Sequence, residues 1–412
     1  MTAFRPIVPR VLRVLLALSF AIALASGCGG GSTDGPGVGG GGTGSPQSFS
    51  QGPITGFGSI IVNGVHFDDS GASVTDDDGN ALSNTQSLRL GTEVEVHGGA
   101  IANGVAPAST IVVHVDLLGP VTAAWNASTG RLSVLGQPVQ VLPSTALDGL
   151  PGGASAITAG KVVAVSSLYD KASGVYVATR IDPVAGATRF SIRGAPSAVD
   201  ATAGTFTIGT QAFAFDSATP PAGLATGQLV RVVLSTLADS HGRWVASTVG
   251  QAAAVLPDGR LGIVDGVVSS TTDATHFTVA GVQVDASGAH VIPTGAAIKV
   301  SSRVQVVGIV MGGTLVASAV HVTAVDDDQD DDDDQPGGHG NDGKFEVDGA
   351  ILSLDAAHQV FTMRGPTTVD YSAASYAGGK VTDLKVGSRV EVTGDLSPDG
   401  TKLMAKKIKF GR

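Results

Sequence analysis

A short strand pattern recurs five times along this chain of 412 residues. In each copy, two runs of alternating apolar and polar residues flank one glycine. Alternation with a period of two is typical of β-strands, and self-similarity along a chain indicates tandem structural units. The five glycines are Gly64, Gly136, Gly209, Gly281 and Gly365. The repeat therefore predicts a row of small β modules.

Two further signatures complete every copy. A second alternating strand follows, as in LGTEVEV at 90–96 and VGSRVEV at 386–392. A turn dipeptide comes next, and then a strand with a small residue. Such dipeptides supply the positive φ angles that a tight hairpin requires. The dipeptides are Asn103-Gly104, Ser173-Gly174, His241-Gly242, Gly312-Gly313 and Asp399-Gly400, and the small residues are Ala108, Ala178, Ala246, Ala317 and Ala405.

Each unit thus holds five strands, with an irregular connection between the third and the fourth. This count and spacing predict an all-β chain of tandem small five-stranded OB-like barrels, in which glycine kinks let the first strands bend around the barrel. Tandem small β-sandwiches are the alternative. Helix should be scarce, because no segment beyond the N-terminal one carries an apolar stripe with a period of 3.6 residues.

The N-terminal segment has the features of an export signal. Three arginines precede an apolar run, Val14 to Ala25, that is too short to span a bilayer as a helix. Small residues then lead into Cys28, the only cysteine. A peptidase that cuts before a lipid-modified cysteine needs such small side chains, so we expect lipid on Cys28. The chain is then exported and anchored in a bacterial cell envelope, with the outer membrane as the expected location.

The composition along the chain gives the predicted segments. A lipoprotein signal peptide, 1–27, is followed by a Gly/Ser-rich tether, and a dense acidic run separates the last repeat from the others. We number the repeats as modules 1 to 5. The predicted ranges are 28–50 for the tether, 51–117, 118–186, 187–256 and 257–325 for modules 1 to 4, 326–343 for an acidic disordered linker, and 344–412 for module 5.

The first module carries two motifs that together resemble a known family. GxIxGFGSIxVNGVxF stands at 52–67 and LxxGxxVxVxG at 88–98, and module 5 keeps VGSRVEVTG. These motifs are similar to those of the bacterial domain-of-unknown-function family numbered 5666. The resemblance implies repeated small β-barrel modules on exported lipoproteins. It implies no catalytic residues, because the family has no established activity.

Charge and aromatic content argue against a nucleic-acid partner. The formal net charge is −11, and removal of the signal peptide takes away three arginines and no acidic residue. Single-stranded nucleic acid is bound by a positive groove with aromatic platforms, whereas aromatic residues make up 5% of this chain. Several of them, such as Phe206 and Phe213, stand at inward strand positions. We expect the membrane, through the lipid, and an envelope protein or polysaccharide as partners.

The sequence offers little chemistry. His97 and His114 lie on the two strands of one hairpin and could meet His66, but no zinc-ligand spacing and no serine nucleophile motif is present. Asp76 to Asp78 superficially suggest a calcium loop. Such a loop needs carboxylate ligands at its first and last ligand positions, where this sequence has Val74 and Thr85, so a solvated turn is favoured. The sequence predicts a protein that is not an enzyme.

The acidic run at 326–334 is a weak candidate metal site. Calcium accepts carboxylate oxygens without strict geometry, so loosely bound Ca²⁺ is reasonable there, and no other cofactor is expected. The candidate ligands are Asp326, Asp327, Asp328, Asp330, Asp331, Asp332, Asp333 and Asp334. The leading hypothesis is a non-enzymatic binding or spacer scaffold of the envelope. A divalent-cation-responsive binding protein is the alternative, and a hydrolase acting on polysaccharide is the third hypothesis.

Overall fold

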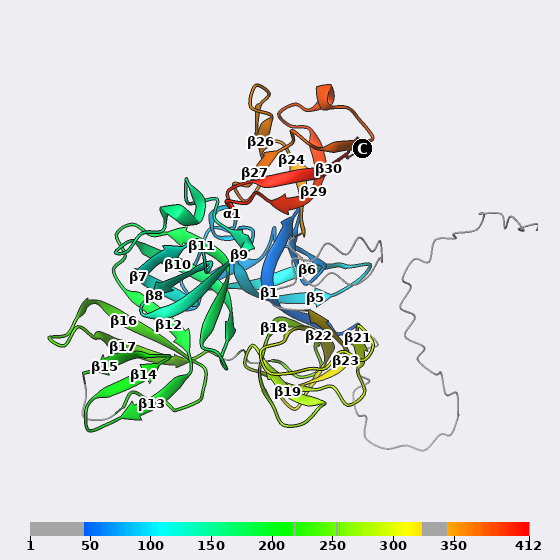
Figure 1. Ribbon diagram of the computed structural model, residues 1–412. Coiled ribbons are helices and arrows are strands. Elements are labelled where there is room, and N and C mark those ends of the chain that lie inside the picture. The colour runs from blue at the N-terminus through cyan, green and yellow to red at the C-terminus, as the bar shows by residue number, and fades with distance from the viewer. Residues whose placement is uncertain (1–44, 217–219, 253, 255, 324–343, 412) are drawn as a thin grey trace, which may run out of the picture. The chain divides into compact units, whose positions relative to one another are not determined.

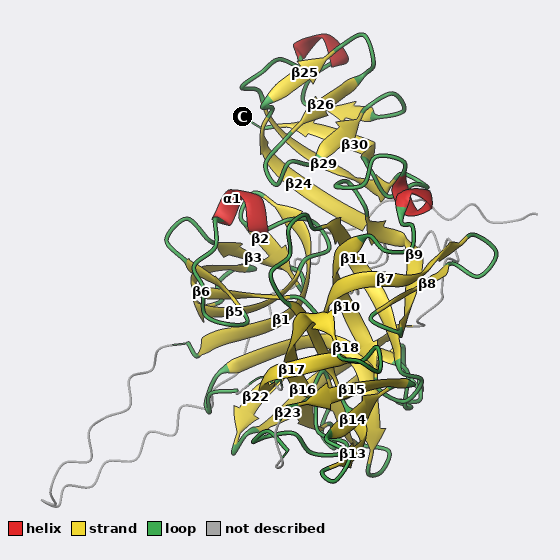
Figure 2. Ribbon diagram, turned by 90° about the vertical axis from the view of Figure 1, so that its left-hand side faces the viewer, coloured by secondary structure: helices red, strands yellow, loops and turns green. Residues whose placement is uncertain are grey.

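The computed structural model describes residues 45–216, 220–252, 254, 256–323 and 344–411. Almost every element in them is a β-strand (Figure 2), which confirms the all-β prediction. The exceptions are a four-residue α-helix, α1 (Asn84–Ser87), and two short 3-10 helices, η1 (Gly153–Ala156) and η2 (Val381–Asp383). Within the described part of the chain, no helix is long and apolar enough to cross a membrane.

Module 1 is a closed barrel of five strands, not a sandwich. Strand β1 pairs antiparallel with β2 and β5, β2 with β3, and β5 with β6, while β3 and β6 pair in parallel and so close the ring. This Greek-key arrangement is that of an OB-like barrel. The strands are β1 (Gln47–Phe57), β2 (Ile60–Val62), β3 (Val65–Asp68), β5 (Glu93–Ala100) and β6 (Val105–His114), with the short β4 (Ser73–Asp76) beside β6.

Modules 2 and 4 repeat this topology with unbroken first strands (Figure 1). Module 2 consists of β7 (Leu117–Asn126), β8 (Arg131–Val134), β9 (Gln137–Ala146), β10 (Val162–Asp170) and β11 (Val175–Pro183). Module 4 consists of β18 (Leu261–Thr271), β19 (His276–Val279), β20 (Val282–Asp285), β21 (His290–Ile292), β22 (Arg303–Met311) and β23 (Thr314–Thr323).

In modules 3 and 5 the first strand is broken into two pieces, which pair with the fourth and the second strand respectively. Module 3 consists of β12 (Phe190–Gly194), β13 (Pro196–Asp200), β14 (Thr205–Ile208), β15 (Gln211–Phe215), β16 (Val230–Ala238) and β17 (Trp244–Gln251). Module 5 consists of β24 (Lys344–Ala350), β25 (Ser353–Asp355), β26 (Val360–Thr362), β27 (Thr368–Asp370), β28 (Ser375–Ala377), β29 (Arg389–Leu396) and β30 (Leu403–Phe410).

The repeated glycines form hairpin turns and do not kink a continuous strand. Gly64 has a φ of 76° and follows Asn63 at 55°, so both central residues of the β2–β3 turn are left-handed. Two such residues make the tight turn that matches the twist of adjacent strands. Gly136 plays the same part in module 2, after Leu135 at 50°. The glycine repeat therefore marks the boundary between the second and third strands.

The closing hairpin of every module contains a β-bulge. In module 1 the pairing skips Ser109, and the same shift occurs beside Ala178, Ala246, Ala317 and Ala405 in the other modules. A bulge bends its strand and increases the local twist, as closure of a small barrel requires. The small residue repeated in the sequence thus marks the bulge.

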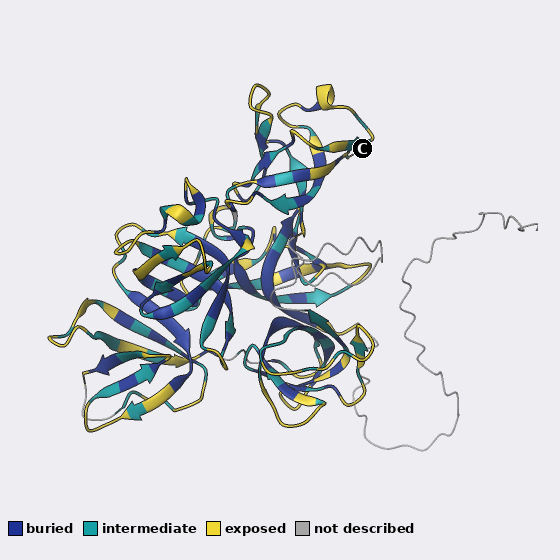
Figure 3. Cartoon of the chain, viewed as in Figure 1, coloured by how far each residue is buried: buried dark blue, intermediate teal, exposed yellow. Residues whose placement is uncertain are grey.

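Buried residues alternate with more exposed ones along many of the strands (Figure 3), and most of the buried residues are apolar. Phe206 and Phe213 are 1% and 0% exposed, which confirms their predicted inward position. One strand also crosses module boundaries, because Phe49 of β1 packs in the core of module 4. Its strand begins at Gln47, so the last four residues of the segment predicted as a Gly/Ser-rich tether, 28–50, belong to a strand that burial of Phe49 stabilises.

Strand β1 joins three modules by backbone pairing. Its residues Ser48 to Gln51 pair antiparallel with β5 on one edge and parallel with β18 of module 4 on the other. Farther along, Gly56 and Phe57 pair in parallel with β24 of module 5. Modules 2 and 3 are joined by an antiparallel pairing of β7 with β12. The outer edges of the first strands are therefore used to connect barrels.

Candidate functional site

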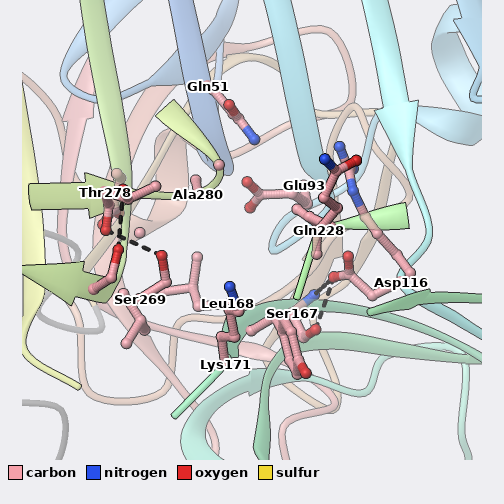
Figure 4. A pocket seen from close by; sticks show the side chains of 18 of the residues that line it. Gln51, Glu93, Asp116, Ser167, Leu168, Lys171, Gln228, Ser269, Thr278 and Ala280 are labelled. Atoms are coloured by element: carbon pink, nitrogen blue, oxygen red, sulfur yellow. Dashed lines mark hydrogen bonds between the residues drawn. The ribbon is translucent and has the colours of Figure 1, made fainter. Parts of the chain in front are cut away.

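A cavity of about 390 Å³, open to solvent, is lined by residues of modules 1 to 4 (Figure 4). Its walls carry carboxyl, amide and hydroxyl groups in addition to apolar atoms. Module 1 contributes Gln51 and Glu93; the segment after it and module 2 contribute Asp116, Ser167, Leu168, Tyr169 and Lys171; module 3 contributes Arg193, Gly227, Gln228, Leu229 and Gln251; and module 4 contributes Asp265, Gly266, Val267, Ser269, Ser270, Thr278, Ala280, Gly281 and Gln283.

Glu93 is the most unusual group of this cavity. It is the first residue of β5, is 5% exposed, and its Oε2 atom has no hydrogen-bond partner among the described residues. Burial raises the pKa of Glu93 well above its ordinary value, and the nearby carboxyls of Asp116 and Asp265 raise it further. Gln51 on the adjacent strand β1 is 4% exposed, and its Oε1 atom likewise finds no partner in the part of the chain that the structure describes. Figure 4 shows both side chains directed toward the cavity.

Asp116 lies between the last strand of module 1 and the first strand of module 2. Its Oδ2 atom accepts hydrogen bonds from the backbone amide and the hydroxyl of Ser167, at 2.9 and 2.7 Å. Burial raises the pKa of Asp116, although the charge of Arg193 and the hydrogen bond from Ser167 act in the opposite direction. The Oδ2 atom of Asp116 thus has donors, whereas within the described part of the chain the Oε2 atom of Glu93 has none.

The cationic side chains around the cavity already have partners. Arg193 is 7% exposed and donates to the carbonyl of Ala252. Arg303 donates to both carboxylate oxygens of Asp265, at 3.1 and 2.7 Å. Lys171 donates to the carbonyl of Gly227 at 2.7 Å. The cavity therefore presents unpartnered acceptors rather than free cations.

The aspartates of the predicted solvated turn contact another module. A turn is present, since Gly79 has a φ of 79° and the amides of Asp78 and Asn80 donate to Asp76. The prediction of a solvated turn holds at the tip, where Asp78 and Gly79 are exposed, and fails for Asp77. The side chain of Asp77 is 9% exposed, and Asp78 forms ion pairs with two arginines of module 3. Those arginines are Arg189 and Arg231.

The structure brings two of the three candidate histidines near one another. His97 lies 2.7 Å from Glu95, and His114 lies 3.9 Å from the same carboxylate and 2.7 Å from Asp77. No contact joins His66 to them in the described part of the chain. The charge of His66 instead acts to lower the pKa of Glu346 in module 5. Across the described residues, no three His, Cys, Asp or Glu side chains are placed to hold a metal ion.

The other sequence-predicted sites lie outside the described residues. These are Cys28 and the acidic run Asp326 to Asp334. Sequence reasoning missed Glu93 and Gln51, which lie on the outer face of module 1 and are buried only because other modules cover that face. The single available signal was composition, since the chain has only four glutamates and two of them stand on β5.

The fold and the cavity define a protein of tandem OB-like barrels joined edge to edge. The family model described as "Domain of unknown function (DUF5666)" matches residues 51–111, 119–182, 265–321 and 348–409. These segments make up more than half of the chain, so the chain belongs to this family. They fall in modules 1, 2, 4 and 5, and module 3 lies between the second and third segments.

Two other comparisons add little. No curated protein matches the chain. Among solved structures, the chain is similar to Drosophila Unr CSD456 at 10% identity, with 56% of this chain and 98% of that chain covered and a TM-score of 0.13. At this TM-score the similarity carries no argument.

Proposed function

We propose that this protein is a lipid-anchored, non-enzymatic scaffold of the cell envelope that holds a binding cavity at the junction of its modules. The observation that carries the proposal is the pairing of β1 with strands of two other modules. Modules that share strand edges are held in one arrangement, as a scaffold requires, whereas modules joined only by linkers are not. The lipid anchor rests on the signal sequence and on Cys28.

Ion pairs support the same arrangement. Arg180 of module 2 is 2% exposed and donates to the carbonyl of Leu90 in module 1. Arg89 of module 1 lies 2.6 Å from Asp148 and 2.9 Å from Asp182 of module 2. These contacts leave the two modules little freedom to separate, because a buried charge that loses its partner is costly.

Hydrogen exchange at single residues tests the scaffold. Ser48 to Gln51 pair on both edges, so we expect consecutive amides of this segment to exchange slowly in the full chain. If the modules were independent, β1 would be an edge strand there, and every second amide would exchange quickly. That alternating pattern would overturn the proposal.

Membrane fractionation tests the anchor. We expect the wild-type protein to enter the detergent phase and the Cys28→Ser variant to be released or left unprocessed. Equal recovery of both proteins in the aqueous phase would overturn the lipid anchor and leave the exchange result untouched.

The cation-responsive alternative depends on the acidic run at 326–334. The other acidic candidates, Asp77 and Asp78, are engaged by His114 and by arginines, which makes them poor calcium ligands. The hydrolase hypothesis would need Glu93 or Asp116 as a general acid. A raised pKa does not favour that role by itself, because burial also raises the pKa of acids with a structural or binding role.

A further inference from the structure

Two buried acceptors without donors face the junction cavity, and they come from adjacent strands. They are the Oε2 atom of Glu93 and the Oε1 atom of Gln51. A buried polar atom left without a partner destabilises the folded protein. Such atoms call for an explanation, and a bound ligand or water that supplies the missing partner is one.

The missing partner should be a cationic donor. Lys171 and Arg193 of the lining and the nearby Arg303 all donate to protein acceptors. The charges of Arg193 and Arg303 act on Glu93, but in the described part of the chain no hydrogen bond reaches its Oε2 atom. An ammonium group has three donors and no acceptor, so it can serve Glu93 and Gln51 together. A hydroxyl has one donor and can serve only one of them.

The remaining wall fits a hydroxylated ligand. Ser269, Ser270 and Thr278 line one side, and Gln228 and Gln283 add amide groups. Hydroxyl and amide side chains both donate and accept, as the hydroxyls of a sugar ring do. The volume of about 390 Å³ lies in the range of small-molecule sites.

We propose that the junction cavity binds an amino sugar, with the ammonium group held by Glu93 and Gln51 and the ring hydroxyls held by the Ser, Thr and Gln wall. The inference rests on the proposed binding scaffold and names its ligand class.

Proton release gives this site a signature. In the empty cavity, burial raises the pKa of Glu93, whereas a bound ammonium favours the carboxylate. Binding should therefore release a proton, and the affinity should rise as the pH rises toward the raised pKa of Glu93. A neutral sugar should show neither effect.

Calorimetry with glucosamine tests the proposal on the mature chain, made soluble by Cys28→Ser. We expect saturable binding, with glucose and N-acetylglucosamine at least about tenfold weaker. Glu93→Gln keeps the shape of the side chain but removes its charge, so glucosamine affinity should fall about tenfold or more. The matched control is Glu391→Gln in module 5, which lies outside the cavity and should leave the affinity unchanged.

Several results would overturn the proposal. They are the absence of saturable glucosamine binding, equal binding by glucose, equal binding by free lysine, and an unchanged affinity in Glu93→Gln. Saturable Ca²⁺ binding that Glu93→Gln abolishes would assign the cavity to a metal. Slow exchange along β1 in Glu93→Gln would show that the variant is assembled, so loss of the ligand and failure of the scaffold are distinguishable.

Discussion

The closing hairpins of modules 1 and 5 begin with fourth strands of similar sequence and have different environments. LGTEVEVHG in module 1 corresponds to VGSRVEVTG in module 5. Val94 and Val390 are both fully buried in their barrels. On the outer face, however, Glu93 is buried and unpartnered at the cavity, whereas the corresponding Arg389 is exposed. The inner face of the repeat thus builds the barrel, and the neighbours of the outer face determine what a module can bind.

Gly394→Ala should have the largest effect on this pair of hairpins. A Cβ atom there would lie 2.0 Å from the backbone oxygen of Met404, whereas on Gly98 it would meet first the side-chain Oγ of Ser48, at 2.7 Å. We expect a loss of about 3 kcal/mol in module 5 and about 1 kcal/mol for Gly98→Ala. Denaturant-dependent hydrogen exchange of β29–β30 and β5–β6 measures both. Equal losses in Gly394→Ala and Gly98→Ala would contradict this expectation, because the two bulges would then tolerate a side chain equally well.

Asp77→Asn should weaken the contact between modules 1 and 3 by about 2 kcal/mol. Burial acts to raise the pKa of Asp77, but the hydrogen bond from His114 and the charges of His114, Arg193 and Arg231 outweigh it, so the pKa is lowered. A lowered carboxyl pKa stabilises the folded state above the unfolded pKa, and this contribution disappears as the pH falls through the folded value.

Urea unfolding near neutral pH and near pH 3 checks this expectation, because the difference between wild type and Asp77→Asn should shrink on acidification. Asp383→Asn in module 5 is the control; Asp383 is exposed, and its change should stay below about 0.5 kcal/mol. A difference that persists at low pH would contradict the ionic origin of the contact.

Glu93→Gln should stabilise the empty protein by about 1 kcal/mol near neutral pH. The pKa of Glu93 is raised in the folded state, so its carboxyl favours folding below the unfolded pKa and loses that contribution as the pH rises through the folded value. The variant should therefore gain most at neutral or higher pH and nothing near pH 4. Thermal unfolding across this range measures the gain. A loss of stability at neutral pH would mean that the carboxylate has a protein partner.

Glu391→Gln should have the smallest effect. Glu391 lies 2.8 Å from Lys409, and both side chains are partly exposed. Exposed ion pairs contribute about 0–1 kcal/mol, so we expect a change below about 0.5 kcal/mol at any pH. The same thermal unfolding experiment checks it. A change as large as that of Glu93→Gln would remove the contrast between the two hairpins.

Local sequence predicted the barrels well and their junctions poorly. Alternation along the strand places Val94 and Val96 inside the barrel. Gly64 marks the turn between two strands because glycine readily adopts a positive φ. Both features depend only on residues close together in the sequence. Burial of Asp77 and Glu93 depends on residues of other modules, which no local pattern reports. The sequence likewise left open whether His66 meets His97 and His114; in the structure the charge of His66 acts on Glu346 of module 5.

The titration of the four glutamates tests the central claim most directly. The chain contains only Glu93, Glu95, Glu346 and Glu391, so ¹³C labelling of glutamate side chains gives four carboxyl signals. We expect one signal to titrate well above the ordinary glutamate range and to be the signal lost in Glu93→Gln. If the signal lost in that variant titrates in the ordinary range, Glu93 is not buried without a partner at a junction of modules, and the account is contradicted.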